Sequence, residues 1–136
     1  MENIANEIEF LINNYGIKSL IFDDDNLLAN KRWSKSLFKM MIDRKYNLKW
    51  NYAGAAVNKI DEEMISLMKE SQCQFLNIAI ESGSQRVLRE IIKKPFQDLK
   101  QVKKVIELIK KYNIDLAANF VIGFPGETWD EIRQTI

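Results

Sequence analysis

Carboxylates, hydroxyls and glycines gather in three short segments of this chain. They are Asp23-Asp24-Asp25, Glu81-Ser82-Gly83-Ser84 and Gly123-Phe124-Pro125-Gly126-Glu127-Thr128. Carboxylates accept hydrogen bonds from hydroxyl and ammonium groups, and glycine lets a backbone approach a ligand closely. Each segment follows an apolar run typical of a buried strand. Because the carboxyl ends of parallel strands face one crevice in α/β proteins, the sequence predicts a ligand site there.

Two classes of chemistry are excluded by residue counts. The chain has no histidine, so imidazole catalysis, imidazole metal ligation and Ser-His or Cys-His nucleophile pairs are absent. Its one cysteine, Cys73, excludes an internal disulfide and fits a reducing cytoplasm. Cys73 lies just before an apolar run, so we expect a buried small hydrophobe there rather than a reactive thiol.

Composition gives no sign of a polyanionic or membrane partner. The 136 residues carry 20 Lys plus Arg and 19 Asp plus Glu, for a net charge of +1, so nucleic acid is not expected. No apolar stretch approaches the roughly 18 residues of a membrane span, and the N-terminus lacks the pattern of a signal peptide. We therefore expect a cytoplasmic chain with a single domain over residues 1–136.

The periodicity of apolar residues predicts one helix followed by four β-α units. Strands are expected at 19–22, 50–53, 75–80 and 116–122. Helices are expected at about 4–15, 31–45, 61–68, 84–92, 98–109 and from 128 onward, with capping-box spacing at Asp98/Gln101 and Thr128/Glu131. Alternating strands and helices indicate a parallel sheet with right-handed crossovers.

The two faces of the third predicted strand differ. Leu76, Ile78 and Ile80 share one face, whereas Asn77 alternates with Ala79 and Glu81 on the other. This contrast predicts a curved sheet with helices on its convex side and a partly polar concave interior that holds a ligand. The alternative is that Asn77 and Asn119 are satisfied core amides, bonded to each other or to buried water.

These residues resemble the radical S-adenosylmethionine (radical SAM) enzymes, most closely the branch associated with cobalamin-binding domains. The resemblance runs from about Ile4 to Ile136 and rests on three segments in order. Phe22-Asp23-Asp24-Asp25 is similar to the family's Phe-x-Asp-Asp segment after the second barrel strand. Glu81 to Ser84 is similar to its Glu-Ser-Gly-Ser segment after the fourth, and Gly123 to Thr128 to its Gly-Phe-Pro-Gly-Glu-Thr segment after the fifth.

The resemblance implies contacts to the cofactor S-adenosylmethionine from the first two segments. Glu81 and Ser82, with Gly83 beside them, match groups that contact the ribose or the methionyl part. A carboxylate suits ribose because its oxygens can accept from two adjacent hydroxyls. Asp24 and Asp25 match the acidic segment that receives the amino group of the cofactor. The alternatives for the three aspartates are a solvated turn that caps the next helix, or a divalent cation site.

The third segment would line the adenine. Val121, Ile122 and Gly123 match the fifth-strand backbone that lies against the base in the family, and Gly123 and Gly126 would allow close approach or positive φ. The alternative for Gly123–Gly126 is ordinary turn chemistry. Likewise, Ser82–Ser84 has the alternative of being only an N-cap.

One departure from the family decides what the chain can do. The family binds a [4Fe-4S] cluster with three cysteines in a Cys-x-x-x-Cys-x-x-Cys loop after the first strand, and this chain has a single cysteine. We therefore predict no catalytic and no metal-ligating residue here. The chain corresponds to units two to five of a six-unit partial (β/α) barrel, the cluster and any cobalamin belonging to a longer parent. That parent would cleave S-adenosylmethionine reductively to a 5′-deoxyadenosyl radical, and the fragment alone would be inactive.

Two other readings remain open from the sequence. One is a free-standing module that binds a nucleotide or phosphate in the same crevice without redox chemistry. The other is a subunit that completes its barrel with a second chain. Open edges of a parallel sheet would also favour self-association.

Overall fold

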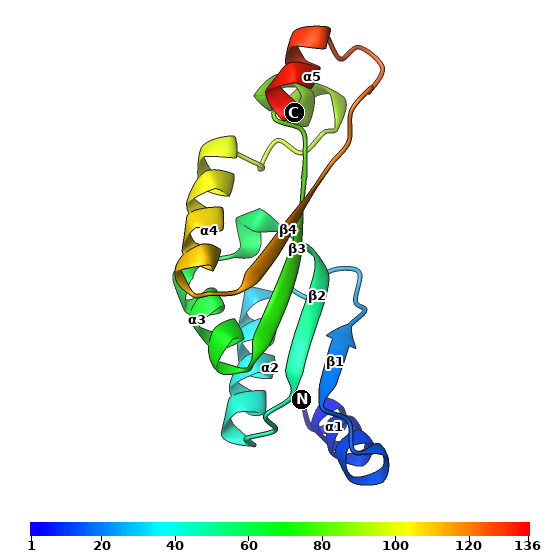
Figure 1. Ribbon diagram of the computed structural model, residues 1–136, viewed down its shortest axis with the longest axis vertical. Coiled ribbons are helices and arrows are strands. Elements are labelled where there is room, and N and C mark those ends of the chain that lie inside the picture. Colours follow the sequence, from blue (N-terminus) through cyan, green and yellow to red (C-terminus); the bar gives the residue numbers. More distant parts are fainter.

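The chain forms an open, four-stranded sheet with helices packed against one face (Figure 1). The computed structural model describes residues 1–136. The strands are β1 (Ser19–Phe22), β2 (Lys49–Ala55), β3 (Cys73–Glu81) and β4 (Asp115–Phe120). They are parallel and lie in chain order, so β1 and β4 form the two open edges. The predicted α/β fold with a four-stranded parallel sheet is confirmed.

The crossover helices lie on the same side of the sheet. The helices are α1 (Glu2–Tyr15), α2 (Lys31–Asp43), α3 (Glu62–Glu70), α4 (Leu99–Lys111) and α5 (Trp129–Thr135), with a 3₁₀ turn η1 (Val57–Lys59) and a π-helical turn η2 (Val87–Ile91). Figure 1 shows α2, α3 and α4 side by side along the sheet, with α5 beyond the upper ends of β3 and β4. None of these helices has the length and apolar character needed to cross a bilayer.

Side-chain caps fix where several helices begin. Thr128 and Glu131 form the predicted capping box in full at the start of α5, and Asp61 caps α3 as predicted. At α4 the prediction is half right. Asp98 accepts a backbone N–H at 2.7 Å, but Gln101 returns no bond to the cap, so Asp98 acts alone.

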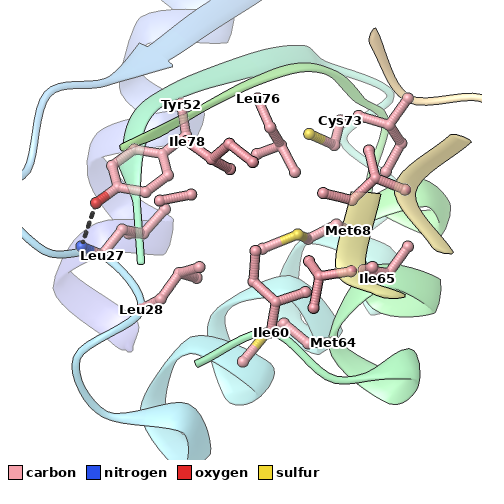
Figure 2. Packing of buried hydrophobic residues seen from close by; sticks show 14 of the residues in the cluster. Leu27, Leu28, Tyr52, Ile60, Met64, Ile65, Met68, Cys73, Leu76 and Ile78 are labelled. Carbon is pink, nitrogen blue, oxygen red and sulfur yellow. Dashed lines mark hydrogen bonds between the residues drawn. The ribbon is translucent and has the colours of Figure 1, made fainter. Parts of the chain in front are cut away.

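The core lies between the sheet and helices α2, α3 and α4. The Trp50 ring stacks on Phe38 with centroids 5.0 Å apart, and its Nε1 donates to the Ser71 carbonyl at 2.8 Å. Figure 2 shows Tyr52, Leu76 and Ile78 facing methionines and isoleucines of the helix layer. Burying these large side chains is the main favourable contribution to folding.

The predicted contrast between the two sheet faces is confirmed in β3. Leu76, Ile78 and Ile80 are buried under the helices, whereas Asn77 and Ala79 are only partly covered on the helix-free face. Asn77 Nδ2 donates to Asn119 Oδ1 at 3.4 Å, as in the alternative considered above. Yet Asn77 Oδ1 is buried with no partner, so one polar atom on this face is left for another group.

Two strand ends differ from the predicted ones, both at register shifts to a neighbouring strand. Strand β2 continues to Ala55, since Gly54 takes φ +87° as an extra residue where the register to β3 shifts. Strand β4 ends at Phe120 rather than Ile122, just where its register to β3 shifts between Ala79 and Glu81. The predicted helix over 84–92 is shorter, its regular part being η2.

Candidate functional site

The end of β3 is a tight, strained turn centred on Glu81. This residue has φ +73°, a left-handed backbone that non-glycine residues rarely adopt, and the Ser82 N–H donates back to the Ile80 carbonyl at 3.0 Å. Such a conformation costs on the order of 1–3 kcal/mol and is found mostly at functional sites. The bulge and this turn together re-aim the Glu81 side chain at the carboxyl end of the sheet.

One of the two oxygens of the Glu81 carboxylate has a hydrogen-bond partner within the chain. Its Oε1 accepts from Lys94 Nζ at 2.8 Å, and the two side chains are 22% and 40% exposed. Its Oε2 makes no hydrogen bond to the protein. Glu81 and Lys94 therefore offer one free acceptor atom next to an ammonium group.

A hollow of about 550 Å³ opens beside this pair. Three backbone segments line it, one after each of β1, β2 and β3, and they contribute Asp25, Asn58 and Lys94 among others. Lys59 and Lys93 also line it, and neither has an ionic partner. The hollow thus lies where parallel strands end and carries both signs of charge.

The acidic segment after β1 is exposed and held as a turn. Asp24 Oδ1 accepts from the Asn26 backbone N–H at 2.8 Å, and the cap of α2 is Asn30, so the aspartates do not cap that helix. No group of three or more carboxylate or cysteine side chains in the structure is arranged to hold a metal ion. Of the predicted residues, Asp25 lines the hollow.

This turn is tied to the core by buried contacts of Leu27, whose carbonyl accepts from Ser34 Oγ at 2.7 Å. The Leu27 backbone N–H donates to the Tyr52 hydroxyl at 2.9 Å, drawn as the dashed line in Figure 2. Leu27 and Tyr52 are both buried, and burial raises the pKa of the Tyr52 hydroxyl, which therefore stays protonated at neutral pH. A side chain of β2 thus positions the acidic loop of β1.

Ser82 and Gly83 face inward, against α5. Ser82 is fully buried, its Oγ accepts from the Ser84 N–H at 3.1 Å and it shares a hydrogen bond with Thr135 Oγ1 at 3.4 Å. The Gly83 N–H donates to the same Thr135 hydroxyl at 2.9 Å. A Cβ on Gly83 would lie 2.1 Å from the Gln134 carbonyl oxygen, so glycine is required by close approach.

The segment after β4, which begins at Val121, lies next to the turn at Glu81. The Val121 N–H donates to the Glu81 carbonyl at 2.8 Å, which places Val121 beside the turn at Glu81. Val121 and Ile122 are 45% and 53% exposed, an apolar surface next to the Glu81 turn. Gly123 has φ +87°, a conformation that suits glycine.

The Glu127 side chain folds back onto the backbone at the start of the turn, at Gly123 and Phe124. Its Oε2 accepts from the backbone N–H groups of Gly123 at 2.7 Å and Phe124 at 3.1 Å. Its Oε1 is buried without a partner. The carboxylate therefore fixes the shape of the Gly123–Gly126 turn from within.

An ion pair between the exposed Arg86 and the buried Glu131 joins the two segments. Glu131, which is 8% exposed, accepts from Arg86 Nε at 2.7 Å and Nη2 at 2.6 Å, and from Ser84 Oγ at 3.0 Å. Arg86 Nη2 also donates to the Gly126 carbonyl at 2.9 Å. The guanidinium, then the Thr128 N–H, holds the pKa of Glu131 well below its ordinary range, so the carboxylate is charged.

Comparison with known proteins agrees with this geometry. The model of the Radical SAM superfamily matches residues 1–136. The chain belongs to the radical SAM superfamily. The resemblance drawn from its three strand-end segments is confirmed.

Two curated relatives are methyltransferases by name. An uncharacterised methyltransferase of Pyrococcus horikoshii is 33% identical over 100% of this chain and 29% of its own length. Cytidylyl-2-hydroxyethylphosphonate methyltransferase of Streptomyces wedmorensis is 31% identical over 99% of this chain and 26% of its own length. The chain therefore spans under a third of each relative.

Solved structures show the same fold. The radical S-adenosylmethionine methyltransferase TsrM of Kitasatospora setae superposes with a TM-score of 0.84 at 17% identity, over 97% of this chain and 27% of that protein. The cobalamin-dependent S-adenosylmethionine radical enzyme OxsB superposes with a TM-score of 0.80 at 13% identity, over 98% of this chain and 21% of OxsB. The strands of this chain thus correspond to part of a radical SAM barrel.

The structure brings some predicted radical SAM residues together and reveals others. Glu81 and Val121 are joined by a backbone hydrogen bond, and Asp25 shares a hollow with Lys94, the ion-pair partner of Glu81. No pattern in the sequence identified Lys94 as the partner of Glu81 or Arg86 as the partner of Glu131. The Glu131 cap was predictable, but its second role as partner of Arg86 was not.

Proposed function

We propose that residues 1–136 form part of the S-adenosylmethionine-binding wall of a longer radical SAM enzyme. The observation that carries the proposal is the joint between the Glu81 carbonyl and the Val121 N–H, 2.8 Å apart. This hydrogen bond joins two strand-end segments into one continuous surface. One segment carries the Glu81 carboxylate on a strained backbone, and the other carries exposed apolar residues. A ligand that is polar at its sugar and flat and apolar at its base matches that sequence of groups.

In this proposal, Glu81 accepts hydrogen bonds from the ribose. Its Oε2 has no partner in the chain, and a carboxylate oxygen is a strong acceptor for hydroxyl groups. Ser82 and Gly83 contribute through the shape of the loop, since the Ser82 hydroxyl is buried and engaged. Direct contact of the Ser82 side chain with the cofactor stays a prediction from the family resemblance.

Asp24 and Asp25 receive the amino group of the methionyl part. Both are exposed at the end of β1, and Asp25 lines the hollow that Lys94 also lines. An ammonium group beside a carboxylate, with a lysine opposite for a carboxylate of the ligand, is the charge arrangement that a free amino acid requires. The Asp25 and Lys94 side chains supply it from two different strands.

Val121, Ile122 and Gly123 bind the adenine. Val121 and Ile122 expose about half of their surface at the end of β4, and burying that surface under a flat base is favourable. Gly123 at φ +87° keeps the backbone free of a side chain at the edge of this surface. The Glu127 carboxylate accepts hydrogen bonds from the backbone N–H groups of Gly123 and Phe124. These bonds hold the turn in place before the adenine binds, which pre-organises the contact with the base.

In the longer enzyme, these residues would hold S-adenosylmethionine for reductive cleavage by one electron from a [4Fe-4S] cluster, which would give methionine and a 5′-deoxyadenosyl radical. The one cysteine of this chain, Cys73, is buried and cannot provide three thiolates, so the cluster ligands must come from another part of the enzyme. Residues 1–136 by themselves would therefore not cleave S-adenosylmethionine. The names of the two relatives above favour methyl transfer as the reaction of the whole enzyme.

The test is the affinity of the full-length, cluster-loaded enzyme for S-adenosylmethionine, measured by equilibrium dialysis. Glu81→Gln should weaken binding by about tenfold or more, because a charged acceptor of a hydrogen bond contributes about 1.5–3 kcal/mol. Glu107→Gln is the matched control, since Glu107 is an exposed glutamate on α4 with no partner. Equal affinities of the two variants would refute the role of Glu81.

A further inference from the structure

The Arg86–Glu131 pair lies outside the groups assigned to the cofactor, yet it touches both segments that carry them. Arg86 follows the Ser82–Ser84 loop, and Glu131 opens α5 just after the Gly123–Gly126 turn. The pair is bidentate, at 2.7 and 2.6 Å, which fixes direction as well as distance. It joins residues 45 positions apart at the ends of neighbouring strands.

Both ends of the pair are tied to the loops by further contacts. Ser84 Oγ donates to Glu131 at 3.0 Å on the β3 side, and Arg86 donates to the Gly126 carbonyl at 2.9 Å on the β4 side. The Thr128 N–H and hydroxyl complete the shell of the carboxylate at 2.9 and 3.0 Å. Five donors therefore hold one buried carboxylate in one place.

Helix α5 packs against the other side of the loop after β3. Thr135 accepts from the Gly83 N–H at 2.9 Å, and Gly83 has no room for a Cβ against Gln134. The loop after β3 is thus held between Arg86–Glu131 and the last turn of α5. The acidic segment after β1 is held separately, by the buried hydrogen bonds of Leu27 to Tyr52 and Ser34.

From this arrangement we infer that Arg86 and Glu131 are positioning residues for the adenosine half of the ligand. They set the spacing between the ribose segment at 81–83 and the adenine segment at 121–123, and they touch neither group of the ligand. This inference rests on the proposed function. It predicts a selective defect: loss of the pair weakens ligands that contain adenosine and leaves methionine, held by the segment after β1 and by Lys94, unaffected.

The experiment compares three probes on the full-length, cluster-loaded enzyme: S-adenosylmethionine, 5′-methylthioadenosine and methionine. Glu131→Gln keeps the size of the side chain but removes its charge, and should weaken the two adenosine ligands by about 10- to 100-fold, the range for partners that orient ligating groups. Binding of methionine should not change. Glu90→Gln is the matched control, because Glu90 meets the same arginine at 3.5 Å in an exposed pair.

Further variants keep the test sharp if Glu131→Gln folds poorly. Arg86→Lys retains the charge but not the bidentate fork, and should give a smaller loss of the same selectivity. The melting temperature of each variant is measured alongside. Equal losses for all three probes, or no loss for any, would overturn the positioning role. Failure of the wild-type enzyme to bind either adenosine ligand would instead refute the proposed function, and this inference with it.

Discussion

Replacing Tyr52 by phenylalanine tests how the acidic loop is held. The Tyr52 hydroxyl is the acceptor of the Leu27 N–H at 2.9 Å, and the two residues are 1% and 3% exposed. Without the hydroxyl, that N–H stays buried and unpaired, which costs about 1–3 kcal/mol. The ratio of folded to unfolded chain should fall by roughly 5- to 150-fold. The melting temperature should fall by about 3–10 °C.

The assay is urea unfolding of the chain, combined with hydrogen exchange at the Leu27 amide. Tyr46→Phe is the matched control, because the Tyr46 hydroxyl meets Glu9 at 2.9 Å in a half-buried place where water can replace it. We expect the control to lose less than about 1 kcal/mol. A Tyr52→Phe variant as stable as the control, with the Leu27 amide still protected, would show that this N–H finds another acceptor.

Three more perturbations follow from the geometry. Gly83→Ala should displace α5, since a Cβ would meet the Gln134 carbonyl oxygen at 2.1 Å; unchanged amide protection over 129–135 would contradict this. Burial raises the pKa of the Cys73 thiol to about 12, so iodoacetamide at pH 8 should label it only after unfolding, and rapid labelling of the native chain would refute the assignment. Because the folded pKa of Glu131 lies below its ordinary 4.5, its charge stabilises the chain above about pH 4.5, and this contribution is lost as pH falls further. In urea unfolding, the stability of the wild-type chain over Glu131→Gln should therefore be smaller at pH 3 than at pH 7. An equal difference in stability at the two pH values would exclude the mechanism.

Local patterns in the sequence predicted the layers of the fold. Alternation in β3 identified Leu76, Ile78 and Ile80 as the buried face, because the period of a strand is a property of a few neighbouring residues. The Thr128–Glu131 capping box was predictable for the same reason. Each of these features depends on positions only a few residues apart.

Features that depend on contacts between distant residues were missed. Strand β4 ends at Phe120, where its register to β3 shifts between Ala79 and Glu81, and no residue of β4 itself predicts this end. The pairing of Glu81 with Lys94 depends on the path of the intervening loop, and that of Arg86 with Glu131 on two strands being neighbours. A charged residue in a sequence does not reveal which of the 39 charged residues will be its partner.

Helix α5 also bears on the order in which the chain folds. It has seven residues, fewer than the roughly 12–15 that an isolated helix needs to persist in water. Its capping carboxylate, Glu131, is the same group that binds Arg86, so its first turn gains its full set of partners only once β3 and β4 have paired. We expect α5 to be the last element to form during refolding, and pulsed hydrogen exchange should show its amides protected after those of β3. Early protection of α5 would contradict this order. If α5 does form last, a nascent or partly folded chain lacks the surface that we propose to bind adenosine, even with its sheet already assembled.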